Sequence, residues 1–255
     1  MPIEIVTLPA RSDNYAYIIH DPETGDTVSI DAPEERPIVQ ALRWRNWELT
    51  QIWLTHHHTD HTEAVADLKE RYRCKVVGHA KDAARLPPLD LAVNEGDSVK
   101  LGNTEAVVLD VSGHTIGHIA FHFPTEKVAF TADSLMALGC GRVFEGTHAM
   151  MWDSLSKFIA MDPETLIYSG HNYGKANGRF AMSIEPNNAQ LIDRIKRIED
   201  ADSKGKPIVP VSLEEELSTN PFLRAREEKV KIAVGLAGAD DAGAFAEIRR
   251  RKDSF

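Results

Sequence analysis

Residues 55–62 read T-H-H-H-T-D-H-T, with four histidines and one aspartate within six consecutive positions. Imidazole and carboxylate groups are ligands that suit zinc, iron or manganese. In an extended segment, side chains two residues apart point to the same side, so His56 and His58 can share one ion while the histidine between them points elsewhere. Asp60 and His61 follow where the chain turns. The spacing therefore favours two adjacent metal sites over one.

A solvated, histidine-rich loop without metal is the alternative interpretation. It explains the pattern less well, because the five polar residues directly follow an apolar run, Q-I-W-L-T, that is typical of a strand. Loops at strand ends are where folds of this kind place functional residues. We therefore expect the segment to lie on a loop between this strand and a helix that begins at Thr62.

Three further ligand candidates each follow an apolar run and a small residue. They are His114 in V-L-D-V-S-G-H-T, Asp133 in A-F-T-A-D-S and His171 in L-I-Y-S-G-H-N-Y. Taken singly, each histidine could be a structural residue, and the aspartate could cap a turn or a helix. Taken together with the histidine loop, they predict a metal centre assembled from four segments.

Short β-like runs dominate the first two-thirds of the chain, and only two helical patterns, at 37–47 and 62–72, lie between them. The predicted strands are 3–8, 15–19, 27–30, 51–55, 74–78, 104–111, 118–123, 127–131 and 165–169. A doubly wound sheet would need a helix after nearly every strand. The pattern instead predicts an α+β fold, with two packed sheets covered by helices.

The character of the sequence changes near residue 175. Helices are expected at 187–201, 213–218 and 242–252, with a loop at 203–210 and no convincing strand. This change predicts two domains, residues 1–173 carrying the metal centre and residues 174–255 forming a mostly helical C-terminal domain.

The composition restricts the possible partners. The 255 residues carry a net charge of -10, which argues against binding to nucleic acid or to anionic membranes. No secretory signal is recognisable, and no apolar stretch approaches the roughly 20 residues that span a bilayer. Cys74 and Cys140 match neither a disulfide framework nor a zinc motif. We expect a monomeric protein in the reducing cytoplasm and a structural role for Cys140, which has no adjacent base to make it a nucleophile.

The T-H-x-H-x-D-H segment, with His114, Asp133 and His171, resembles the metal signature of the metallo-β-lactamase superfamily. The stretches G-C-G-R-V-F-E-G-T, S-G-H-N-Y, I-E-P-N-N, T-N-P-F-L-R, R-R-R-K-D-S-F and D-N-Y-A-Y-I-I are similar to glyoxalase II, the hydroxyacylglutathione hydrolases. The resemblance covers nearly the whole chain. It implies an αβ/βα sandwich followed by a smaller helical domain.

The resemblance also implies two divalent metal ions, zinc first, with iron or manganese as alternatives. Their ligands would be His56, His58 and His114 for one ion, Asp60, His61 and His171 for the other, and Asp133 between them. Two cations can share a water and lower its pKa towards about 7. The implied reaction is attack of this bridging hydroxide on S-D-lactoylglutathione, which yields D-lactate and glutathione in methylglyoxal detoxification. Asp60 and Asp133 would orient the hydroxide.

The resemblance carries four positions over to the glutathione part of the substrate. Arg142 would contact its peptide backbone, Tyr173 its cysteinyl part, and Arg249 and Lys252 its glycine carboxylate. These last two belong to the basic run I-R-R-R-K, which could instead only complement the end of a helix. Some relatives have tyrosine where this chain has Phe144, so one hydroxyl contact is missing here.

Four other functions are weighed against this one. A persulfide dioxygenase would also act on a glutathione derivative, but those relatives use fewer of the second-site ligands. A β-lactamase or a nuclease does not account for the C-terminal stretches. A metal-stabilised binding protein without activity would not need the bridging aspartate. Asp31, in S-I-D-A-P, is a candidate for orienting a ligand histidine, with capping of the next segment as the alternative.

Overall fold

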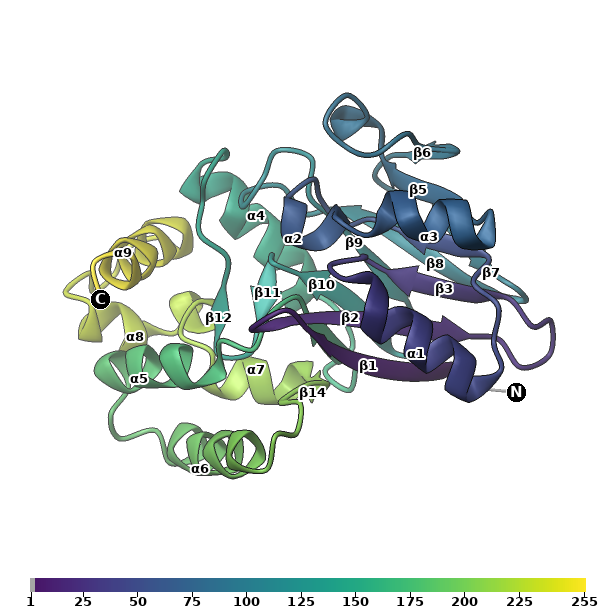
Figure 1. The fold of residues 1–255 in the computed structure, drawn as a ribbon. Coiled ribbons are helices and arrows are strands. Elements are labelled where there is room, and N and C mark those ends of the chain that lie inside the picture. The colour runs from purple at the N-terminus through teal and green to yellow at the C-terminus, as the bar shows by residue number, and fades with distance from the viewer. Residues whose placement is uncertain (1–2) are drawn as a thin grey trace. The chain divides into compact units, whose positions relative to one another are not determined.

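The computed structural model describes residues 3–255, which form two compact units (Figure 1). The first unit contains the described residues up to Asp110 together with Ile116–Ala132. The second unit contains Val111–Thr115 together with Asp133–Phe255. The predicted division at residue 173 stays a prediction.

The first unit has a six-stranded sheet in the order β1 to β6. Its strands are β1 (Glu4–Ala10), β2 (Asn14–His20), β3 (Thr27–Ile30), β4 (Gln51–Trp53), β5 (Lys75–His79) and β6 (Leu91–Val93). The first three strands pair antiparallel and the others parallel. Parallel pairs need a crossover connection, which α1 (Glu35–Arg45) and α3 (Val65–Tyr72) provide. Both helices bury apolar side chains in one core with this sheet.

A second set of strands in this unit pairs antiparallel in the order β7, β8, β9, β10. They are β7 (Ser98–Leu101), β8 (Thr104–Asp110), β9 (Ile119–Phe123) and β10 (Val128–Ala132). Aromatic side chains join the two sets. Trp53 lies 5.1 Å from Phe121 between ring centroids, and Tyr17 lies 5.3 Å from Phe130. The predicted packing of two sheets is therefore observed.

The second unit is mostly helical. Its elements are β11 (Leu135–Met136), β12 (Gly139–Cys140), α4 (His148–Ile159), β13 (Leu166–Ser169), α5 (Gly174–Ile184), α6 (Ala189–Ser203), β14 (Val211–Ser212), α7 (Leu213–Thr219), η2 (Leu223–Arg226), α8 (Glu228–Ala233) and α9 (Asp241–Asp253). Phe222 stacks between Phe180 and Phe245, with ring centroids 5.8 and 6.0 Å away. This aromatic core links α5, the segment before η2, and α9.

Every strand predicted from the sequence overlaps an observed strand, and the three helices expected after residue 175 are present. The expectation of no strand in that region was wrong, because β14 pairs antiparallel with β13 through only two residues. So short a pairing leaves no alternation in the sequence that would reveal it.

Candidate metal centre

The histidine loop, His56–His61, follows β4 and ends in the short helix α2 (Thr59–Thr62). The Nε2 atom of His56 lies 3.1 Å from Nδ1 of His58. Two nitrogens that bind one ion at about 2.0–2.1 Å are spaced in this way. His57 points elsewhere, and its Nδ1 lies 3.1 Å from the buried carboxylate of Asp82. The alternation expected from an extended segment is therefore present.

The loop turns earlier than the sequence predicted. Helical structure begins at Thr59 and not at Thr62, because the N–H of His61 already donates to the carbonyl of His58, at 2.9 Å. Asp60 and His61 consequently sit on the helical turn. Asp60 receives two hydrogen bonds from the buried side chain of Asn14, at 3.0 Å to its carbonyl and 3.1 Å to its carboxylate. The sequence analysis assigned no role to Asn14.

Asp31 holds the ring of His61. Its carboxylate lies 2.7 Å from Nδ1 of His61 and accepts the N–H and hydroxyl of Thr55, both at 2.9 Å. A carboxylate beside Nδ1 favours the tautomer that leaves Nε2 as a metal ligand. Of the two roles considered for Asp31, the structure supports the contact with a ligand histidine, since the N-cap position of α1 is occupied by Glu34 and not by Asp31.

A second histidine outside the predicted set supports the loop. The ring of His118 stacks on that of His56, with centroids 4.6 Å apart and planes at 17°. Both rings are buried. His118 directly precedes a strand, and nothing in its sequence context distinguishes it from a core residue.

The second unit brings its three predicted ligands together. One oxygen of the Asp133 carboxylate lies 3.4 Å from Nε2 of His114 and 3.3 Å from Nε2 of His171, and all three side chains are buried. His114 donates from Nδ1 to the carbonyl of Arg142, at 2.8 Å, so its Nε2 faces the carboxylate. A carboxylate oxygen between two imidazoles is a donor arrangement that suits metal ions rather than a structural ion pair.

Gly141 allows the chain to pass this group of ligands. Its N–H donates to the carbonyl of Asp133, at 2.9 Å. A Cβ atom at this position would lie 2.1 Å from that carbonyl oxygen and 2.9 Å from Nδ1 of His114. No other residue type fits without displacing the ligands.

Two of the four predicted substrate residues offer exposed groups in the second unit. Arg142 has a side chain that is 63% exposed, and the ring of Tyr173 stacks on His171 with centroids 4.7 Å apart. Lys252 is half-buried over the rings of Phe180 and Phe255. Desolvation, followed by repulsion from nearby guanidinium groups, lowers its pKa.

Arg249 is buried, unlike the other predicted substrate residues. Its guanidinium donates to the carboxylate of Asp253, at 2.8 and 3.1 Å, and to the carbonyl of Cys140, at 3.0 Å. A substrate carboxylate would therefore have to replace Asp253 at this group.

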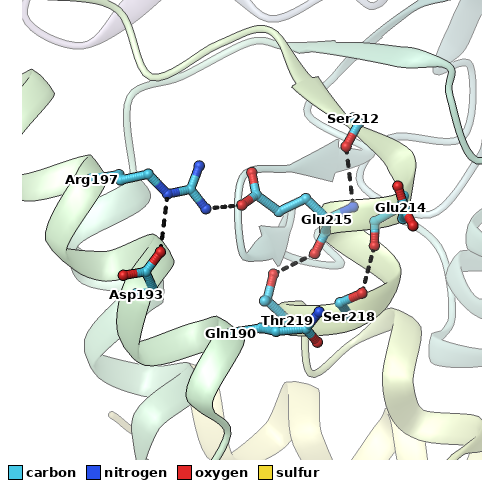
Figure 2. Close-up of a pocket in the computed structure, with 8 residues that line it drawn as sticks. All are labelled: Gln190, Asp193, Arg197, Ser212, Glu214, Glu215, Ser218 and Thr219. Carbon is cyan, nitrogen blue, oxygen red and sulfur yellow. Dashed lines mark hydrogen bonds and ion pairs between the residues drawn. The ribbon is translucent and has the colours of Figure 1, made fainter.

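The second unit also has a surface hollow that none of the predicted ligands or substrate residues lines. It is lined by Gln190, Asp193, Arg197, Ser212, Glu214, Glu215, Ser218 and Thr219 (Figure 2). Its single arginine is already paired with Glu215 and Asp193. Its three carboxylates outnumber this one cation, so the hollow is unsuited to an anionic substrate.

The cysteines take no part in the site. Both are free and buried, and burial raises the pKa of each thiol to about 11. They are protonated at neutral pH, as the structural interpretation of Cys140 requires. In the described residues, 3–255, no helix is long and apolar enough to cross a membrane.

The packed sheets and the clustered histidines and aspartates that could hold a metal define a metallo-β-lactamase-type protein. The family model described as "Metallo-beta-lactamase superfamily" matches residues 23–171. The model described as "Hydroxyacylglutathione hydrolase C-terminus" matches residues 172–255. A hydroxyacylglutathione hydrolase of Ruegeria pomeroyi is 57% identical over 255 residues, the full length of both chains. The chain belongs to the hydroxyacylglutathione hydrolase family.

Solved structures share the fold of this chain. The structure of ETHE1 from Myxococcus xanthus has a TM-score of 0.66 and 27% identity, and the match covers 100% of this chain and 99% of that one. The structure of TTHA1623, in a di-iron-bound form, has a TM-score of 0.61 and 25% identity, with 86% and 100% covered. The predicted fold class and the resemblance to glyoxalase II are confirmed.

Proposed function

We propose that this protein hydrolyses S-D-lactoylglutathione to D-lactate and glutathione, a step of methylglyoxal detoxification. The observation that carries the proposal is the Asp133 carboxylate oxygen, which lies between the imidazoles of His114 and His171 in the second unit. The same unit contains the half-buried ammonium group of Lys252, which is suited to an anion. Full-length identity to hydroxyacylglutathione hydrolases supports the same reaction. We also propose that the protein is a monomer and that it acts in the cytoplasm.

We assign the seven ligands to two divalent ions. His56, His58 and His114 would bind the first, Asp60, His61 and His171 the second, and Asp133 both. Imidazole and carboxylate donors without a thiolate suit zinc, with iron or manganese as alternatives. The di-iron form of TTHA1623 is a property of that protein and makes iron worth testing here.

Two such ions, when bound, would supply a nucleophilic hydroxide at neutral pH and would polarise the thioester carbonyl. The residues of the chain set the geometry. Asp31 and the Arg142 carbonyl fix the rings of His61 and His114, so both present Nε2. Asp60 and Asp133 would orient the attacking group by accepting its hydrogen. The leaving thiol has a pKa of about 8.5, so it departs as a thiolate and needs no separate general acid.

Arg142, Tyr173, Arg249 and Lys252 would bind the glutathione part. Glutathione carries two carboxylates and one ammonium group, so its thioester is anionic. A local group of cations is therefore needed in a chain with a net charge of -10. The contacts that can be assigned all fall on glutathione, so other acyl groups should be accepted as well.

The test is loss of thioester absorbance when the full-length protein, loaded with zinc, iron or manganese, meets S-D-lactoylglutathione. Turnover that a chelator abolishes is the expected result. Absence of turnover with every metal would overturn the proposal. Oxygen consumption with glutathione persulfide would then indicate a dioxygenase. Binding of glutathione analogues that survives metal removal would indicate a binding protein.

A further inference from the structure

The hairpin of residues 135–140, formed by β11, a turn and β12, connects two parts of the proposed site. Asp133 precedes it, and Arg142 follows it. Its conformation therefore fixes where the bridging carboxylate lies relative to the carbonyl that orients His114. The N–H of Gly141 closes the segment on the Asp133 carbonyl, at 2.9 Å.

The turn of this hairpin is strained. Leu138, which is fully buried, has a φ of 57°, in the left-handed region. This conformation is unfavourable for a residue with a Cβ and persists only where surrounding contacts impose it. Some interaction must therefore hold the turn.

Glu216 of α7 supplies that interaction. Its buried carboxylate accepts the N–H of Leu138, at 3.1 Å, and a side-chain N–H of Asn220, at 2.9 Å. The other oxygen pairs with the buried guanidinium of Arg194, which also donates to Thr219, at 2.7 Å. The guanidinium thus compensates the buried carboxylate, and the contacts on both oxygens hold it at one position.

Other helices of the second unit bind the rest of the hairpin. The Asn220 side chain, directly after α7, donates to the carbonyls of Met136 and Gly139, at 3.3 and 3.0 Å. Asn177 of α5 donates to the carbonyl of Ala137, and Arg249 of α9 donates to that of Cys140, both at 3.0 Å. All three donor side chains are buried. The strands of the hairpin pair through only two residues each, so these side-chain hydrogen bonds are needed to fix its backbone.

We propose that Glu216 is a positioning residue of the active site: it holds Leu138 in its left-handed conformation and so fixes Asp133 and Arg142 at the two ends of the hairpin. The inference rests on the proposed function, since it gives Glu216 a role in that reaction. Glu216 touches neither substrate nor metal, and it acts through the hairpin backbone.

The test is Glu216→Gln in the full-length protein. The amide must place a donor against either Arg194 or the pair of donors from Leu138 and Asn220. It therefore either opposes the Arg194 guanidinium or leaves the Leu138 N–H without its acceptor, and both orientations weaken the anchor of the turn. Loss of partners that orient metal ligands lowers metal affinity or activity by about 10-fold to 100-fold. We expect a fall of this size in zinc affinity, measured by chelator competition without substrate, and in kcat, with KM changed less.

Two matched controls separate positioning from stability. Glu214→Gln changes an exposed carboxylate of the same helix, α7 (Figure 2). Glu185→Gln breaks a buried pair with Arg224, bonded at 2.6 and 3.1 Å, that does not contact the hairpin. Both should keep the parent zinc affinity and kcat, and only Glu185→Gln should lower Tm.

Unchanged zinc affinity and kcat in folded Glu216→Gln would overturn the proposal. So would equal losses in Glu185→Gln. If Glu216→Gln does not fold, Asn177→Ala tests the same hairpin through one hydrogen bond to Ala137, and unchanged zinc affinity there would also overturn it. Because zinc affinity is measured without substrate, a failure of the proposed hydrolysis would leave this result readable.

Discussion

At the scale of single residues, the ligand histidines depend on partners that fix their rings. Asp31 and the carbonyl of Arg142 each face Nδ1 of one histidine, His61 and His114, at 2.7 and 2.8 Å. Both partners leave Nε2 for a metal. The identity of a ligand is thus readable from the sequence, but its usable nitrogen is set by a neighbour.

Asp133→Ala should damage metal retention and turnover together. The substitution removes the one carboxylate oxygen that lies within 3.4 Å of both His114 and His171. We expect losses at or above the upper end of the about 10-fold to 100-fold range for outer partners. Metal analysis after dialysis and kcat of the reloaded enzyme are the measurements. Full metal content with normal kcat would contradict the assignment of Asp133.

Asp253→Asn should lower KM for the glutathione thioester. The Asp253 carboxylate now occupies the guanidinium of Arg249, which the proposal gives to a substrate carboxylate. A partly exposed pair contributes about 0.2–1 kcal/mol, so the gain should reach at most about fivefold. Steady-state kinetics measure it, with kcat as the internal control. A higher KM would mean that Asp253 orients Arg249 and does not compete with substrate.

Phe144→Tyr should also lower KM. The ring of Phe144 is exposed and lies 5.2 Å from the ring of His114, between centroids. A hydroxyl on it would supply the substrate contact that we expect a tyrosine to make at this position, and a hydrogen bond contributes about 0.5–1.5 kcal/mol. Kinetics with the parent as control decide the matter. An unchanged KM would show that water or another group already serves this part of the substrate.

At the scale of elements, short segments between strands and helices carry the site, and the helices fix those segments. The stretch G-C-G-R-V-F-E-G-T illustrates this. Gly141 packs closely against Asp133 and His114, and Thr147 is the N-cap residue of α4. The Thr147 side chain accepts the N–H of Met150, at 3.1 Å. One stretch thus contains a glycine that the geometry of the site requires and a threonine that only caps a helix.

Thr147→Ala should therefore reduce stability without affecting catalysis. Loss of an N-cap side chain costs about 1 kcal/mol. Urea unfolding should register this change in the free energy of unfolding, while kcat and KM remain those of the parent. Thr147→Ser, which keeps the acceptor oxygen, is the matched control. A large change in kcat would place α4 in the site itself.

At the scale of the whole molecule, buried acids make stability depend on pH. Burial raises the pKa of the Cys74 and Cys140 thiols from 9.0 to about 11, and that of Tyr168 from 10.0 to about 12. These groups bind protons more tightly in the folded protein than in the unfolded chain. Their contribution is complete below the unfolded pKa values and is lost as the pH rises through the folded ones.

The free energy of unfolding should accordingly fall between about pH 9 and pH 11. Each thiol can contribute up to about 1.36 kcal/mol per pH unit. Cys140→Ala should flatten the decline, and urea unfolding of both proteins across this range measures the difference. Comparing the two proteins at each pH cancels the effect of pH on bound metal. Parallel curves would show that Cys140 ionises normally in the folded protein.

The sequence by itself determined the ligand types, their spacing and most of the strands. His56 and His58 alternate because an extended backbone points them to one side, and such local geometry follows from the order of residues. Only the tertiary structure decided that Asp31 contacts His61, that Arg249 is buried against Asp253 and that Glu216 holds Leu138. These contacts join residues distant in the chain, and burial sets their strength, so no local pattern records them.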